Sequence, residues 1–178
     1  MNAAPADVAL LILRVVIGAT FIAHGWNHAF GGGGLAGTTR WFGQLGMRHP
    51  RLQAVNSTVT EIGAGLLLVL GLLLPLAAAA LIAICCVAGI TAHRRNGFFI
   101  FRDGYEYVLV LGAACAALAL AGPGRISVDE AVGLSNRVPA PVAFGVAVGL
   151  GILGAVLVLA AFWRPAPSEA AREGVAAD

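Results

Sequence analysis

Glu61 is a charged residue in an unexpected place, because it lies near the start of an apolar stretch from 55 to 74. Hydrocarbon cannot hydrate a carboxylate, and a polar group left unsatisfied there costs several kcal/mol. A carboxylate paired with an imidazole can accept and release protons, which satisfies the group and gives it a chemical use. The sequence therefore favours a functional role for Glu61, with a histidine as its partner.

His24 is the predicted partner. At about 1.5 Å per helical residue, Glu61 and His24 lie roughly 9 Å from the same ends of their predicted helices. His28, four residues after His24, shares its helix face, and His93 and Glu106 fall at the same end of two later apolar stretches. The sequence predicts that these residues line one polar pocket, with Glu61 and His24 as its catalytic pair.

Two other interpretations of these residues are open. Trp26, His28 and His93 could be interfacial side chains whose polar tips extend toward water. The histidines together with Glu61 also carry the donor atoms of a zinc or iron site. Because histidine is common at membrane interfaces, a pair of histidines four residues apart is weak evidence for a metal. No metal is therefore predicted.

The elements that must position these residues follow from the composition. Hydrophobic residues make up 59% of the 178 residues, charged residues only 11%, and the mean hydropathy is +0.87; a soluble domain carries about 25% charged residues. About 17 to 25 apolar residues are needed to cross a bilayer as a helix. Five stretches meet this need: 8–30, 55–74, 76–92, 105–121 and 141–163. The chain is expected to be an all-α, polytopic membrane protein in contact with the lipid bilayer.

Turn residues predict where several of these helices begin and end. Pro75 can begin a helix because its missing N–H would have no partner there, so the second and third spans should form a tight hairpin. Asn56, Ser57 and Thr58 are candidate N-caps for the second span. The Gly-Pro-Gly sequence at 122–124 is predicted to end the fourth.

Arginine is distributed unequally between the two faces of the membrane. We call side A the face that carries the loops after the first and third spans and the C-terminal tail. Side A holds eight arginines, the opposite face holds two, and Arg14 lies within the first span, where it is expected to bind carbonyl groups or reach the interface. Side A is therefore predicted to be cytoplasmic and the N-terminus external. All four histidines fall at side A, and no nucleic-acid partner is expected from a net charge of +2.

The fifth span carries small residues at a helix-packing spacing. Gly145 and Gly149 are four residues apart, which is typical of closely packed membrane helices. This face is predicted to join the fifth span to the outside of the other helices or to form a homo-oligomer contact. Residues 41–47 form a short amphipathic segment predicted to lie on the cytoplasmic leaflet, and residues 31–34 a flexible exit from the first span.

Several segments, taken in order, resemble the DoxX family of bacterial membrane proteins. They are residues 11–25, 41–46, 61–72, 103–107 and 122–129, so the resemblance covers about 8–134. It implies a four-helix transmembrane bundle at 8–134. The additional C-terminal transmembrane helix at 141–163 departs from the family's usual four-span plan, and the tail at 164–178, rich in alanine and glutamate, is expected to be disordered and cytoplasmic. It also implies a place in the bacterial cell (inner) membrane and kinship with the DoxD-like small subunit of thiosulfate:quinone oxidoreductase.

The resemblance leads to two classes of function. The first is an integral membrane subunit of a redox system that binds quinone, is coupled to thiol, sulfur or oxidative-stress chemistry, and receives electrons from cytoplasmic redox enzyme partners. Glu61 and His24 would exchange protons with the quinone, and the expected cofactor-binding residues are His28, His93, Glu106, Tyr105, Trp26 and Phe98. The alternative is a non-catalytic membrane scaffold that recruits such enzymes to its arginines, or a small-molecule or lipid transporter.

Overall fold

The computed structural model describes residues 4–135 and 137–165, and in this part of the chain the ordered elements are helical. The predicted all-α class is therefore confirmed. The predicted tail at 164–178 falls almost wholly outside the described residues. The helices are α1 (Pro5–Phe30), α2 (Gly34–Gln44), α3 (Pro50–Leu70), α4 (Leu74–Ala88), α5 (Glu106–Ala121), α6 (Val128–Ala131) and α7 (Ala140–Phe162).

Four helical segments are long and apolar enough to cross a bilayer, and they belong to a multi-pass membrane protein. They are Pro5–Phe30, Pro50–Leu70, Leu74–Asn96 and Ala140–Phe162. The third of these continues α4 through a π-helical turn, Gly89–His93, and a 3₁₀ turn, Arg94–Asn96. α5 is apolar but shorter, with 16 residues.

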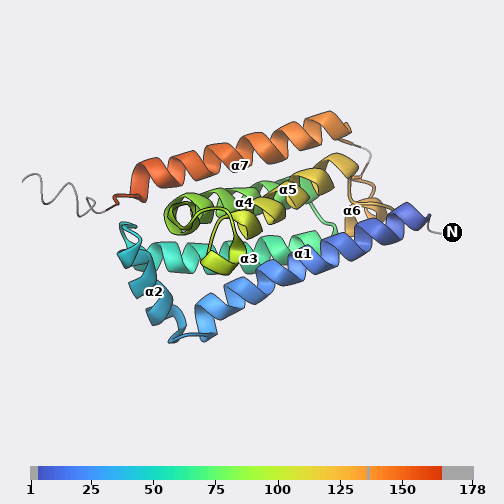
Figure 1. The fold of residues 1–178 in the computed structure, drawn as a ribbon. Helices are drawn as coiled ribbons and strands as arrows, with labels where there is room; N and C mark the ends of the chain where they lie inside the picture. Colours follow the sequence, from blue (N-terminus) through green and yellow to red (C-terminus); the bar gives the residue numbers. More distant parts are fainter. Residues whose placement is uncertain (1–3, 136, 166–178) are drawn as a thin grey trace, which may run out of the picture.

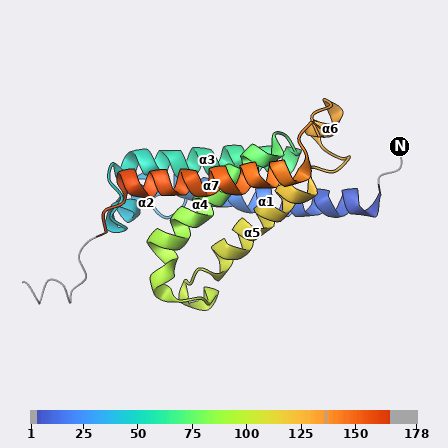
Figure 2. The same cartoon turned by 90° about the horizontal axis from the view of Figure 1, so that it is seen from above.

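α1, α3 and α7 lie along a common direction, with α1 and α7 on opposite sides of the other helices (Figures 1 and 2). α1 packs along α3, and α7 packs along α4 and α5. Seen from above, α4 and α5 run obliquely away from the other helices toward the loop that joins them (Figure 2). The core between the helices is built mainly from leucine, isoleucine and alanine, including Leu68, Leu74, Ala78, Leu81 and Leu118.

The turn between α3 and α4 is the tight hairpin that the sequence predicts. Gly71 ends α3 with φ +63°, a left-handed conformation that glycine adopts without strain. Pro75 then lies in the first turn of α4, where its missing N–H has no consequence.

The start of α3 differs from the prediction. The helix begins at Pro50, so Ser57 and Thr58 lie inside it rather than at its N-cap. The Thr58 hydroxyl instead donates to the Ala54 carbonyl, 2.8 Å away, one turn earlier in the same helix. Glu61 consequently lies about 16 Å along the helix from its first residue, farther from the helix start than predicted.

α7 contacts its neighbours through a different face from the one predicted. Gly145 and Gly149 are open, since an added Cβ would meet no atom within 4 Å. The buried stripe consists of small residues every four positions: Ala143, Ala147, Gly151 and Ala155. At Gly151 an added Cβ would lie 3.0 Å from the Ala79 carbonyl oxygen, so α7 approaches the backbone of α4 at this point.

The end of the molecule opposite side A is closed by the segment after α5. Arg14, fully buried at 0% exposure, donates from Nη2 to the Ile126 carbonyl at 2.5 Å. Its Nη1 is 3.5 Å from the Val69 carbonyl oxygen. The expectation that Arg14 binds carbonyl groups is thus confirmed. Asp129 completes the closure by accepting the N–H groups of Leu73 and Leu74 at 2.9 and 3.2 Å.

Candidate functional site

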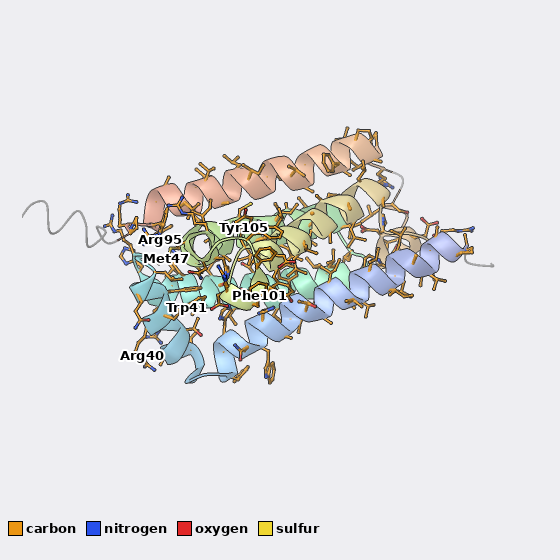
Figure 3. All side chains as sticks on the ribbon, in the orientation of Figure 1. Arg40, Trp41, Met47, Arg95, Phe101 and Tyr105 are labelled. Atoms are coloured by element: carbon orange, nitrogen blue, oxygen red, sulfur yellow. The ribbon has the colours of Figure 1, made fainter. Side chains whose placement is uncertain are left out.

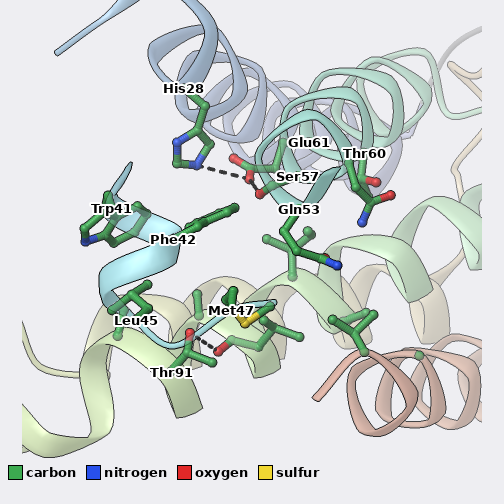
Figure 4. Close-up of a pocket in the computed structure, with 18 of the residues that line it drawn as sticks. His28, Trp41, Phe42, Leu45, Met47, Gln53, Ser57, Thr60, Glu61 and Thr91 are labelled. Atoms are coloured by element: carbon green, nitrogen blue, oxygen red, sulfur yellow. Dashed lines mark hydrogen bonds and ion pairs between the residues drawn. The ribbon is translucent and has the colours of Figure 1, made fainter. Parts of the chain in front are cut away.

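A cavity of about 230 Å³ lies at the side A end of the molecule, between α1, α2, α3, α4 and α7 (Figure 4). One wall, from α3, is polar, and the remaining walls are mainly aromatic or aliphatic. The lining residues are His28, Trp41, Phe42, Leu45, Met47, Gln53, Asn56, Ser57, Thr60, Glu61, Ala80, Ala83, Ile84, Val87, Ala88, Thr91, Ala92, Gly154 and Val158.

Glu61 forms the centre of the polar wall. Its side chain is nearly inaccessible, with the residue 3% exposed. The Ser57 hydroxyl donates to its Oε1 at 2.5 Å, and Nε2 of His28 lies 3.4 Å from the same oxygen. Among the described residues, neither contact uses Oε2. One carboxylate oxygen is therefore held by the protein, while the other is free to meet a molecule in the cavity.

Gln53 is a second buried polar residue on this wall. It is only 6% exposed, and its amide makes no side-chain hydrogen bond to another described residue. Gln53, Ser57 and Glu61 follow one another at four-residue intervals on α3, so they share one face of the helix. An amide that offers two donors and an acceptor is thus available to a ligand beside the carboxylate.

α2 holds His28 in place and covers the ion pair between His28 and Glu61. The chain reverses direction at residues 32–34, three glycines with positive φ angles, and α2 then folds back over the end of α1. The Thr38 hydroxyl donates to the His28 carbonyl at 2.8 Å. The rings of Trp41 and Phe42 lie 6.1 and 6.0 Å from the imidazole, measured between ring centres. The predicted amphipathic segment 41–47 is therefore a cover over the cavity.

The end of α7 fixes this cover from the other side. Nε1 of Trp163 donates to the Leu45 carbonyl at 2.9 Å, and Met47 forms an antiparallel bridge with Trp163. Two backbone hydrogen bonds join the same segments, from Arg48 to Phe162 at 2.7 Å and from Arg164 to Gly46 at 2.8 Å. The additional C-terminal helix, which also lines the cavity, is thus part of the candidate site.

The structure corrects the predicted pairing of Glu61. The described ion pair of Glu61 is with His28, whereas His24 is exposed and has its Nε2 3.4 Å from the Tyr107 hydroxyl. The reason is the rotation of α1. Gly25 faces α3, where an added Cβ would lie 3.1 Å from the Glu61 Cβ. His28, three residues later, lies on the same face as Gly25, and His24 does not.

The other predicted site residues lie outside the cavity, so the expected convergence on one pocket does not occur. Nδ1 of His93 is 2.8 Å from the Asp103 carbonyl oxygen, and Glu106 accepts the Ile100 N–H at 3.0 Å. Both interactions shape the α4–α5 loop.

The three aromatic residues predicted for the site also lie elsewhere. Tyr105 and Phe98 meet edge to face in the same loop, 5.5 Å between ring centres. Trp26 is exposed on α1 and packs against Phe30. Figure 3 shows Trp41 and Met47 at the end of the molecule that carries α2.

Sequence reasoning missed Gln53, Thr60 and the role of Ser57. The signal that was present is the spacing of polar residues at 53, 57, 60 and 61, which places them on one side of a mainly apolar helix.

The described residues contain no group of three or more histidine, cysteine, aspartate or glutamate residues that could hold a metal ion.

Residues 9–94 match the sequence model of the DoxX family. The match confirms the predicted resemblance over these residues and supports a DoxX family assignment, whereas the segments 103–107 and 122–129 lie outside the matched range. It includes most of α1 and all of α2, α3 and α4, and with them Glu61, His28 and the polar wall of the cavity. Neither the curated proteins nor the solved structures contain a match to the chain.

Proposed function

We propose that this DoxX-family chain is the membrane subunit of a redox system and binds the headgroup of a quinone in the cavity beneath α2. The observation that carries this proposal is the buried Glu61, which is held through one oxygen by Ser57 and His28 and has the other free at the cavity wall. The family supports it, because DoxX proteins are membrane proteins often linked to redox or stress.

The size and lining of the cavity fit a quinone headgroup. Clefts that bury a drug-sized ligand measure about 300–1,000 Å³, so a cavity of about 230 Å³ suits a single ring whose apolar tail remains in the bilayer. The Gln53 amide offers hydrogen-bond donors to a carbonyl oxygen of the ring. Phe42 and Ile84 provide apolar surface for its faces.

The groups that would handle protons are Glu61 and His28. Reduction of a bound quinone to a quinol takes up two electrons and two protons. In this proposal a cytoplasmic redox enzyme supplies the electrons, and Glu61 and His28 deliver the protons at the ring oxygens. Ser57 orients the carboxylate through its short hydrogen bond to Oε1. α2 keeps bulk water away from the pair.

The membrane orientation belongs to the same proposal. With eight arginines on side A and two on the opposite face, the rule that positive loops stay in the cytoplasm places side A and the cavity there. The N-terminus is then external, in the cell membrane of a bacterium. A cytoplasmic electron donor would approach the end of the molecule that carries the cavity.

The test is the quinone content of the protein purified in mild detergent, measured after solvent extraction and expressed per mole of protein. Glu61→Gln and His28→Gln should each lower the retained quinone about tenfold, since each removes a hydrogen-bonding or charged group at the headgroup. His24→Gln is the matched control, because this histidine is exposed on the same helix outside the cavity. Wild-type protein free of quinone, or equal losses in all three variants, would contradict the proposal and favour the scaffold function.

A further inference from the structure

A second cavity, of about 510 Å³, lies on the other side of α4, between α4, α5 and α7. It shares no lining residue with the cavity that contains Glu61. Its walls are apolar except near one end, where Arg94 and Tyr105 line it. A long apolar cavity with a cation at one end matches a molecule that has an apolar chain and an anionic head.

The length of this cavity matches one leaflet of a bilayer. On α4 and the turn that continues it, the lining residues Ile82, Cys86, Ile90 and Arg94 follow at four-residue intervals. The twelve residue-to-residue steps from Ile82 to Arg94 span about 18 Å at a rise of 1.5 Å each. Half of a hydrocarbon core of roughly 30 Å is about 15 Å. Because α4 runs obliquely to the other helices, the depth between Ile82 and Arg94 is less than 18 Å and thus close to the thickness of one leaflet. Arg94 then lies at headgroup level when Ile82 lies near the middle of the membrane.

Small residues keep the cavity open along its length. An added Cβ at Gly89 would meet only Val108, at 3.5 Å, and on α5 the lining includes Gly112, Ala113 and Ala116. Ile152 of α7 closes the far side. The space between these residues is lined by small and apolar side chains, as an acyl chain requires.

The charge of Arg94 is available to a ligand. Its guanidinium carbon lies 5.4 Å from the centre of the Trp163 ring, which holds the side chain at the membrane surface. Within residues 4–135 and 137–165 no carboxylate forms an ion pair with Arg94. The nearby Glu106 accepts a backbone N–H of its own loop instead. A planar guanidinium in this position is suited to bind a phosphate through two hydrogen bonds.

We propose that this cavity binds one anionic phospholipid, with its phosphate on Arg94 and one acyl chain between α4 and α5. The positive charge at the headgroup end selects an anionic lipid over a zwitterionic one, and the apolar wall selects a lipid over free phosphate. The site is independent of the quinone site, because it lies on the opposite side of α4.

The experiment measures lipid retained by the full-length protein after exchange from micelles that contain equal amounts of phosphatidylglycerol and phosphatidylcholine. Native mass spectrometry counts the bound molecules. One phosphatidylglycerol per chain is expected. Arg94→Gln should lower its retention about five- to tenfold, since one basic residue near a headgroup contributes about that factor. Arg95→Gln removes the same charge from the adjacent residue, which does not line the cavity, and should leave retention unchanged.

A second pair of variants tests the acyl chain. Ala113→Leu fills the cavity and should also reduce retention, whereas Ala117→Leu, one turn further along α5 and outside the lining, should not. Equal retention of the two lipids, a broad distribution of lipid numbers, or equal effects of the two arginine variants would overturn the proposal. Inorganic phosphate that releases the lipid would show that the headgroup alone determines binding, and would overturn the role of the acyl chain.

Discussion

Gly25 of α1 lies directly against Glu61 of α3. A Cβ placed on Gly25 would be 3.1 Å from the Cβ of Glu61 and 3.0 Å from the Thr58 carbonyl oxygen. This contact sets the rotation of α1, turning His28 toward the carboxylate and His24 away from it. The absence of a side chain at Gly25 thus determines which histidine pairs with Glu61.

Gly25→Ala should destabilise the protein and separate α1 from α3. The added methyl meets a backbone oxygen, which cannot move without shifting the helix, so we expect a loss of about 1–3 kcal/mol in the free energy of unfolding. A thermal or denaturant transition in detergent measures this. Gly63→Ala is the matched control, since an added Cβ there meets no atom within 4 Å. Equal transitions for the two variants would contradict the close approach.

Ser57→Ala removes the hydroxyl that donates to Oε1 of Glu61. Because a buried acceptor then loses a partner, we expect a destabilisation of about 1–3 kcal/mol together with lower quinone retention. Thr58→Ser is the control, because it keeps the hydroxyl that bonds to the Ala54 carbonyl within α3. If Ser57→Ala retains quinone as well as Thr58→Ser does, Ser57 does not orient the carboxylate.

Gln53→Leu separates ligand binding from stability. The Gln53 amide makes no side-chain hydrogen bond to another described residue, so its replacement by an apolar group of similar size should leave the unfolding transition unchanged or raise it. Quinone retention should fall about two- to tenfold, the contribution of one hydrogen bond. Unchanged retention would remove Gln53 from the proposed site.

Arg14→Met should destabilise the end of the molecule opposite side A. The variant leaves the carbonyl groups of Ile126 and Val69 without their donor, at an expected cost of about 1–3 kcal/mol for each buried group. Arg125→Met is the control, since Arg125 is exposed and its contact with Asp7 is made by the backbone N–H. Proteolysis of residues 122–135 in detergent provides a local readout, and cleavage at equal rates in both variants would contradict this role.

The membrane orientation is tested by cysteine labelling in intact cells, with Cys85, Cys86 and Cys115 replaced by alanine. A cysteine at position 127 should react with an impermeant reagent added outside, and a cysteine at position 95 only after the membrane is opened. Labelling of position 95 from outside would reverse the assignment.

Much of the fold could be predicted from the sequence because helix formation in a bilayer is decided locally. Each span must satisfy its own backbone hydrogen bonds, so hydropathy and turn residues such as Pro75 are sufficient to locate it. The start of α3 was missed because Pro50 begins the helix in a segment that is less apolar than the span itself. The packing face of α7 was wrong because alanine, like glycine, is small enough for close helix packing, and Ala147 rather than Gly149 is buried.

The site was predicted only in part, for a related reason. The position of Glu61 in an apolar stretch identified it as a candidate site residue, because burying a carboxylate in a membrane has a large free-energy cost. Its partner depended on the rotation of α1 about its axis, which is set by contacts between helices. Residues four apart, such as His24 and His28, share a face only within about 40° on an ideal helix, and that difference decides which of them reaches α3.

The attachment of Trp163 to the α2–α3 turn has a consequence for how the protein is made. A polytopic chain is synthesised from its N-terminus, so α1 to α4 leave the ribosome well before α7. Until α7 inserts, the cavity lacks Gly154 and Val158, and Leu45 lacks the indole that holds it. The cavity is therefore completed only when α7 inserts, after α1 to α4 have already reached the membrane.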